Sequence, residues 1–181
     1  MRLFVSVSPP EAVIEVLLGL PRPDLAQLRW TTEKQWHVTL RFLGEVEDPG
    51  PVTAALQVVP AVLAERGVKE VRAALGPTTA WFSGRQVLQA PVAGLDALAR
   101  AVSEVTAACS HGVDDHRFSG HLTLARVRGR ARGPASLAGV PLAASWRVRA
   151  FELMSSVLGP RGARYETMAT VALDPAPAAG A

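Results

Sequence analysis

A tetrapeptide of the form His-aliphatic-Thr-Leu occurs twice in the chain, as HVTL at residues 37–40 and as HLTL at residues 121–124. The copies lie 84 residues apart in a sequence that contains only four histidines. At the same offset LFVSVSPPE (3–11) falls on VLQAPVAGL (87–95), and each reads as a strand followed by the start of a helix. The repeat therefore predicts two similar β-α-β units, packed about a pseudo-twofold axis, with the two histidine strands across one groove.

The length and composition fit one domain. Of the 181 residues, 49% are apolar, which is enough for a sizeable core. We predict a single domain of two lobes over residues 1–175 and a disordered tail at 176–181. No apolar run is long enough for a membrane span, the first residues do not form a signal peptide, and Cys109 is the single cysteine. These features predict a cytoplasmic protein without an internal disulfide or a cysteine-based zinc site.

Hydrophobic periodicity and turn residues predict the secondary structure. One helix is expected from about Pro9–Glu11 to Leu20, with Val13, Val16, Leu17 and Leu20 on its apolar face. Two more are expected at 50–66, where Pro60 must kink or end part of the helix, and at 94–109. The predicted strands are 2–7, 36–44, 68–75, 78–82, 85–91, 120–128, 145–158 and 164–173.

Side-chain alternation along a strand brings the polar residues of each motif together. On the first motif strand one face is expected to carry His37, Thr39 and Arg41, and the opposite face Val38, Leu40 and Phe42. On the second strand His121 and Thr123 share a face, opposite Leu122 and Leu124. Both strands are thus apolar toward a helix layer and polar toward a cleft.

Two imidazoles that face one cleft suit acid–base catalysis on a P–O bond. One neutral imidazole takes a proton from water, and a second, protonated one gives a proton to the leaving oxygen. Thr39 and Thr123 are expected to donate hydrogen bonds to phosphoryl oxygens. Arg126 has the wrong parity for the cleft in an ideal strand, so a bulge or strand end is needed to turn it inward. Cationic side chains can neutralise the developing charge, so we expect no metal and no cofactor.

The motifs and their flanks resemble a known family. HVTLRFLGEV (37–46) and F-x-x-HLTLARVR (118–128) are similar to the paired HxTx motifs of the 2H phosphoesterase superfamily. More specifically, they resemble the RNA 2′,3′-cyclic phosphodiesterases, also called LigT-like or ThpR-type 2′-5′ RNA ligases. The opening RLFVSVSPPE, LRW before the first motif, and FELMSSVLGPRGARYETMA (151–169) resemble the same family. The resemblance thus covers nearly the whole chain.

This resemblance implies a bilobal α+β fold, in which two pseudo-symmetric β-α-β lobes line a central cleft with antiparallel sheets and carry helices outside. It implies hydrolysis of a 2′,3′-cyclic phosphate, on an RNA end or a nucleoside, to a 2′-phosphate without metal or ATP. Some members also join RNA halves through a 2′-5′ link. His37 would be the proton donor and His121 the acceptor, although the sequence alone does not assign these roles. Thr39, Thr123 and Arg126 would hold the phosphate.

Several alternatives stay open. Phe4, and similarly Tyr165, is a candidate for stacking on an RNA base, with core packing as the other role. The segment 125–133 (ARVRGRARG) either attracts an RNA backbone or is a mobile basic loop. His111 and His116, with Asp114 and Asp115 between them, read as a solvated loop more than as a metal site.

Other functions and one departure from the family pattern also remain. The runner-up functions are a 2H phosphodiesterase for another cyclic or 2′-5′-linked nucleotide and a non-catalytic RNA-end binding module. No sequence feature indicates more than a monomer. Ser119-Gly120 stands where several relatives have His-Pro, and Gly120 is expected to permit a closer backbone approach.

Overall fold

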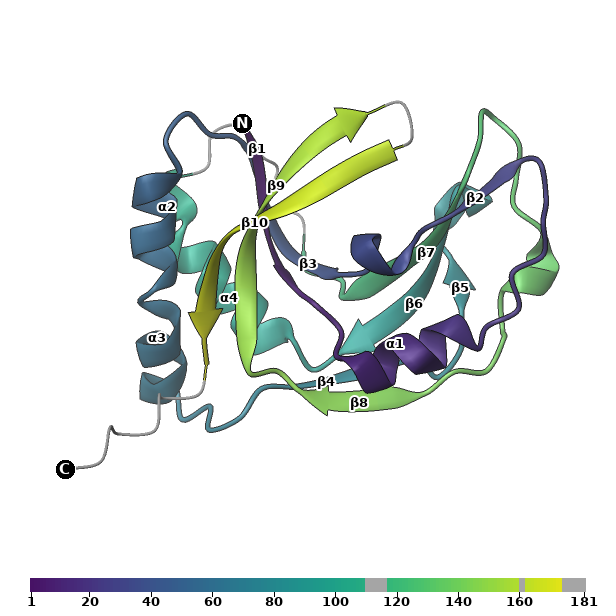
Figure 1. The fold of residues 1–181 in the computed structure, drawn as a ribbon. Coiled ribbons are helices and arrows are strands. Elements are labelled where there is room, and N and C mark those ends of the chain that lie inside the picture. Colours follow the sequence, from purple (N-terminus) through teal and green to yellow (C-terminus); the bar gives the residue numbers. More distant parts are fainter. Residues whose placement is uncertain (110–116, 160–161, 174–181) are drawn as a thin grey trace.

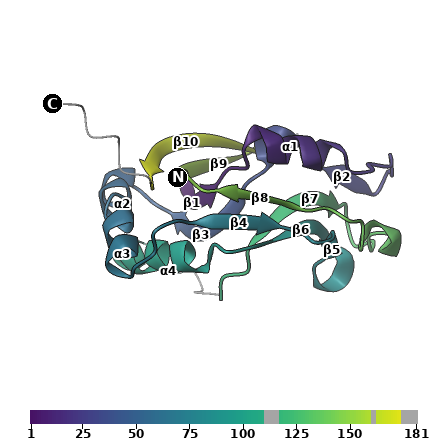
Figure 2. The ribbon, with the colours of Figure 1, turned by 90° about the horizontal axis from the view of Figure 1, so that it is seen from below.

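The computed structural model describes residues 1–109, 117–159 and 162–173 and contains a curled antiparallel sheet with helices outside it (Figures 1 and 2). The predicted tail at 176–181 and the segment with His111 and His116 lie outside the described residues. The helices are α1 (Glu11–Leu18), α2 (Pro49–Leu56), α3 (Val59–Glu65) and α4 (Asp96–Val105). The strands are β1 (Arg2–Val7), β2 (Leu28–Trp30), β3 (Val38–Glu45), β4 (Arg72–Leu75), β5 (Ala80–Trp81), β6 (Val87–Ala93), β7 (His121–Val127), β8 (Ala144–Arg147), β9 (Ala150–Gly159) and β10 (Gly162–Ala172).

The order of strands across the sheet is symmetric. It runs β10-β9-β1-β3-β7-β6-β4-β8, with β2 paired to β7 and β5 to β6. The two motif strands β3 and β7 are therefore central, and the halves meet where Val38 pairs with Leu122. This arrangement confirms the expected α+β fold of two pseudo-symmetric lobes.

The spacing between the first strands of the two units, β1 and β6, is one residue shorter than the 84 residues that separate the motifs. Val5 pairs with Arg41 in the first half, and Leu88 pairs with Ala125 in the second. Ala125 follows Arg41 by 84 residues, but Leu88 follows Val5 by only 83. The difference arises because the register of a strand is set by its pairing with a neighbouring strand. An alignment of one stretch of sequence with another gives no information about that pairing.

Each repeat helix packs against the opposite half of the sheet. α1 follows β1 in the chain but packs on β8, whereas α4 follows β6 but packs on β3. α3 and α2 pack on α4, so these three helices lie together at one end of the molecule and α1 lies apart from them (Figures 1 and 2). The buried apolar cluster accordingly includes residues of both halves, among them Leu17, Leu98 and Phe151.

The predicted elements are present with shifted ends and two corrections. The helical segment expected at 50–66 breaks near Pro60, as predicted, because α2 ends at Leu56 and Pro60 stands in the first turn of α3. Val16 of α1 is 37% exposed, unlike Val13 and Leu17, which are buried. The single strand expected at 145–158 is divided into β8 and β9. These two strands pair with β4 and β1, in different halves of the sheet, and local periodicity cannot reveal such a crossing.

Candidate active site

Matching β-bulges interrupt the two motif strands. In β3, Thr39 pairs with Ser6 and Arg41 with Val5, which leaves Leu40 as an extra residue. In β7, Thr123 pairs with Gln89 and Ala125 with Leu88, which leaves Leu124 as an extra residue. Both leucines are buried. A bulge reverses the side-chain alternation that follows it, so the residues after Leu40 and Leu124 lie on faces opposite to those of an ideal strand.

The first bulge corrects two assignments made from alternation. Arg41, expected beside His37, points to the helix side instead, where its guanidinium donates hydrogen bonds to the carbonyl and Oγ oxygens of Ser103 on α4. Phe42, expected on the apolar face, pairs with Phe4 and is 55% exposed. The sequence did not indicate this bulge, because Leu40 also fits the alternation of a regular strand.

The second bulge brings Arg126 to the face of His121, as the prediction required. Arg126 pairs with Val87, two positions along β6 from Gln89, the partner of Thr123, so Arg126 and Thr123 share a face. The carbonyl groups at this bulge have a partner in Thr31, whose Oγ1 lies 2.8 Å from the carbonyl oxygens of both Thr123 and Leu124. Bulges are common beside active sites because they redirect a side chain in this way.

The two motifs lie across from each other at the centre of the sheet. Because β3 and β7 are antiparallel and Val38 pairs with Leu122, His37 lies beside Thr123, and Thr39 lies beside His121. The four polar side chains therefore share one face of two adjacent strands, in a pseudo-twofold arrangement about the Val38–Leu122 pair.

Aromatic rings pack around His37. The ring centroids of Phe4 and Tyr165 each lie 4.9 Å from that of His37, with Tyr165 edge-on, and the two aromatic rings are 5.3 Å apart. Phe4 is only 3% exposed, which favours its packing role over base stacking. Phe42, whose ring lies 6.2 Å from Phe4, is the most exposed ring of this cluster and was not predicted from the sequence.

His121 is held by similar contacts on its own half. Its Nδ1 lies 2.8 Å from the carbonyl oxygen of Ser119, so Nδ1 carries a proton in the neutral ring and Nε2 is left for a ligand. Phe82 packs edge-on against the imidazole, with ring centroids 4.7 Å apart. Phe82 follows the two-residue strand β5, and no sequence pattern linked it to His121.

Burial is the main influence on the charge of His37. It lowers the pKa of His37 from 6.5 to about 4, with smaller contributions in the same direction from the positive charges of His121 and Arg126. A hydrogen bond with the backbone of Gln35 opposes this lowering of the pKa. His37 is therefore neutral in the free protein at pH 7, and His121 and Arg126 both lie close enough to influence its pKa.

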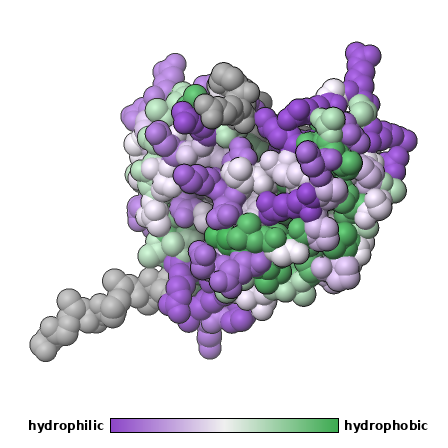
Figure 3. Space-filling view, turned by 45° about the vertical axis from the view of Figure 1, so that its right-hand side comes forward, coloured by the Kyte–Doolittle hydropathy of each residue, from purple (hydrophilic) through white to green (hydrophobic). Residues whose placement is uncertain are grey.

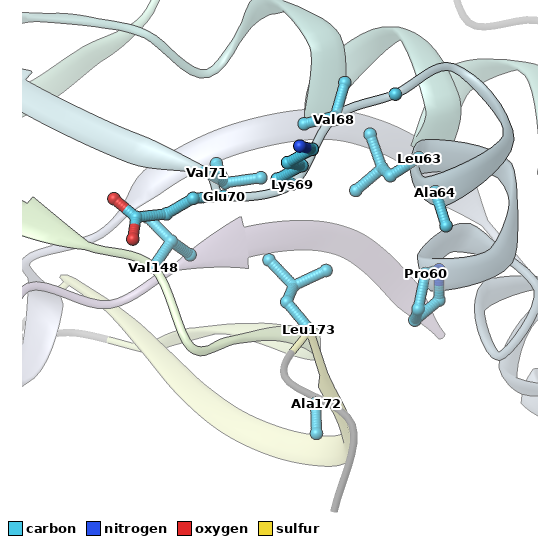
Figure 4. Close-up of a pocket in the computed structure, with 11 residues that line it drawn as sticks. Pro60, Leu63, Ala64, Val68, Lys69, Glu70, Val71, Val148, Ala172 and Leu173 are labelled. Atoms are coloured by element: carbon cyan, nitrogen blue, oxygen red, sulfur yellow. The ribbon is translucent and has the colours of Figure 1, made fainter.

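Among the residues described, no group of three or more His, Cys, Asp or Glu side chains could hold a metal ion. No described helix is long and apolar enough to cross a bilayer. A pocket of about 540 Å³ lies elsewhere, between α3, the chain before β4 and the end of β10 (Figure 4), and holds none of the predicted site residues. Its lining is Pro60, Leu63, Ala64, Gly67, Val68, Lys69, Glu70, Val71, Val148, Ala172 and Leu173.

Solved structures share this fold along nearly the whole chain. No protein-family model matches the sequence, and no curated protein matches it significantly. The crystal structure of TT0787 of Thermus thermophilus has a TM-score of 0.73 at 29% identity, covering 96% of this chain and 98% of that chain. Escherichia coli LigT complexed with 3′-AMP has a TM-score of 0.70 at 21% identity, covering 96% and 98%. The PDE domain of MHV ns2 has a TM-score of 0.56 at 14% identity, covering 93% and 99%. The chain therefore has the LigT-like fold of the 2H phosphoesterases, as its motifs implied.

Proposed function

We propose that this chain is a metal-independent phosphodiesterase that hydrolyses the terminal 2′,3′-cyclic phosphate of RNA to a 2′-phosphate. The observation that carries the proposal is the crossed arrangement of the motifs, with His37 beside Thr123 and His121 beside Thr39 on one sheet face. A site that only bound RNA ends would not require two imidazoles in matched surroundings. A cytoplasmic monomer remains the predicted form.

In the proposed reaction a water oxygen attacks phosphorus, and the bond from phosphorus to the 3′ oxygen breaks. One neutral imidazole accepts the proton of the water, and the other, protonated, gives its proton to the 3′ oxygen. Thr39 and Thr123 donate hydrogen bonds to the phosphoryl oxygens, and the Arg126 guanidinium offsets their negative charge. Exchange of protons with solvent restores both imidazoles for the next turnover.

The pKa of His37 bears on which histidine is the proton donor. The family resemblance assigns the donor role to His37, yet burial lowers the pKa of His37 to about 4 in the free protein. A donor must be protonated, so this assignment requires that the charge of bound phosphate raise the pKa of His37. The opposite assignment makes His37 the base, which must be neutral before it accepts a proton, and burial keeps it neutral.

Three observations support a nucleotide as the substrate. Arg126 shares the face of the motif residues, and arginine suits contacts with phosphate. The exposed ring of Phe42 beside Phe4 offers a surface on which a base can stack. The structure of E. coli LigT, which has the same fold, is a complex with 3′-AMP. Reverse ligation through a 2′-5′ link is proposed as a further activity of the same site.

A direct test measures hydrolysis of nucleoside 2′,3′-cyclic phosphates and identifies the product by phosphorus NMR. His37→Ala and His121→Ala are each expected to lower kcat/KM by about 10²-fold or more. Gln57→Ala, at an exposed position after α2, should retain activity and serves as the control. Near-normal activity of either histidine variant would refute the shared mechanism. Binding of nucleotide without any turnover by the unchanged chain would identify a binding module instead.

A further inference from the structure

Strand β2 places a second arginine directly beside Arg126. In the pairing of β2 with β7, Arg29 is the cross-strand partner of Arg126, and such partners point to the same face of a sheet. Arg126 lies on the face of the two histidines, so Arg29 extends this face away from them. Both side chains are exposed. The neighbouring Leu28 is buried, which agrees with alternation along β2.

The pairing of Arg29 with Arg126 has no acidic counterpart. Like charges directly opposite each other destabilise a sheet, yet within the described part of the chain no carboxylate forms an ion pair with either arginine. Residues 116–151 include seven arginines and no Asp or Glu, and residues 25–32 also lack an acid. An anionic ligand is the natural partner of two such guanidinium groups.

A third arginine continues the same line. The backbone N–H of Arg128 donates to the carbonyl of Gln27 at 2.7 Å, which extends the β2–β7 ladder beyond its last strand residue. Arg128 therefore shares a face with Arg126, about 7 Å further along the chain. The loop that follows is anchored, since Gly133 N–H donates to the carbonyl of Arg85 at 2.9 Å. In Figure 3 hydrophilic side chains project at the upper right of the molecule.

We propose that Arg29 and Arg128 form a second phosphate subsite, which binds the internal phosphodiester adjoining the terminal phosphate at Arg126. The inference rests on the proposed function and specifies its substrate class. An RNA end with at least one internal phosphodiester is preferred over a nucleoside cyclic phosphate, because only the RNA end supplies an anion to Arg29. The basic segment 125–133 then contributes at an anchored arginine, Arg128, rather than as a mobile loop.

The test compares three substrates that share a terminal uridine 2′,3′-cyclic phosphate. They are the mononucleotide, a trinucleotide, and the same trinucleotide with neutral methylphosphonate internal linkages. We expect the charged trinucleotide to have a kcat/KM about 10-fold or more above that of the mononucleotide. Arg29→Gln should reduce this ratio at least about 5-fold. With the unchanged chain, the neutral trinucleotide should show no such gain in kcat/KM over the mononucleotide. Arg100→Gln, which removes an exposed charge on α4, should leave the ratio unchanged.

An unchanged ratio in Arg29→Gln, or equal losses on all three substrates, would overturn the proposal while the phosphodiesterase function stood. Hydrolysis of none of the substrates by the unchanged chain would refute the proposed function. The subsite is then decided by binding of a 3′-phosphorylated trinucleotide, measured by fluorescence anisotropy at several salt concentrations. Arg29→Gln should reduce the slope of log K against log salt by about 0.7, and an unchanged slope would overturn the subsite.

Discussion

Protonation of His37 is predicted to destabilise the folded chain as the pH falls below 6.5. The pKa of His37 is about 4 in the folded chain and 6.5 when the ring is free of its surroundings. The unfolded chain therefore binds the proton first, so the folded state loses stability as the pH falls from 6.5 toward 4. These two pKa values correspond to a loss of about 2 kcal/mol between pH 7.5 and pH 5.0, and about 3 kcal/mol at pH 4.

The measurement is urea denaturation of the unchanged chain and of His37→Gln at pH 7.5 and 5.0, followed by tryptophan fluorescence. Glutamine does not titrate, so other titrating groups cancel when the two proteins are compared at each pH. The unchanged chain should lose about 2 kcal/mol more unfolding free energy than the variant between these two pH values. Imidazole NMR signals of His37 give the same pKa directly.

A difference between the two proteins that does not change with pH, or titration of His37 near 6.5, would refute the burial argument. The same NMR experiment bears on the mechanism. Saturation with 3′-AMP should raise the pKa of His37 if it is the proton donor, because the phosphate charge stabilises imidazolium. A pKa that stays near 4 with the ligand bound would instead favour His37 as the base.

Three further predictions concern the site and its support. Arg126→Gln should lower kcat/KM for a nucleoside 2′,3′-cyclic phosphate by about 10- to 100-fold, because a guanidinium that offsets phosphoryl charge is lost; unchanged kinetics would remove Arg126 from the site. Activity should persist in EDTA, since cationic side chains supply the positive charge, and loss that zinc or manganese restores would indicate a metallohydrolase. Gly120→Ala should lower the free energy of unfolding by about 1–3 kcal/mol, because its Cβ would lie 2.1 Å from the carbonyl oxygen of Val92. Equal urea midpoints for the two proteins would contradict that clash.

Much of the fold followed from patterns that are local in the sequence. The sequence places Leu95, Leu98, Ala99, Val102, Val105 and Thr106 on one face of the helix at 94–109, because helical periodicity is set by neighbours within a few turns. All of them except the half-buried Val105 are buried, and Ala101, which this predicted face did not include, is buried as well. The motif strands were predicted from the alternation of apolar and polar residues, which is likewise set by neighbours in the sequence. The assignment of sides failed at Arg41 and Phe42, where a bulge stabilised by the neighbouring strand reversed the alternation.

The residues that complete the candidate site were harder to find. Arg29 lies on a three-residue strand and Phe82 follows a two-residue strand, and elements this short carry no usable periodicity. Each acquires its place from a partner far along the chain, Arg126 for Arg29 and His121 for Phe82. The sequence could name the four motif residues because they recur at one spacing, but not their neighbours, which recur nowhere.

The sequence by itself determined that two equivalent His-x-Thr strands exist and that each is apolar on one side, because repetition and alternation are properties of the linear chain. Only the tertiary structure decided which residues meet. It paired Val38 with Leu122, turned Arg126 inward, and packed Phe4 and Tyr165 around His37. That packing partly buries the imidazole of His37, and burial is a property of distant segments brought together. The two histidines are alike in sequence, and the low pKa of His37 arises from the surroundings that folding supplies.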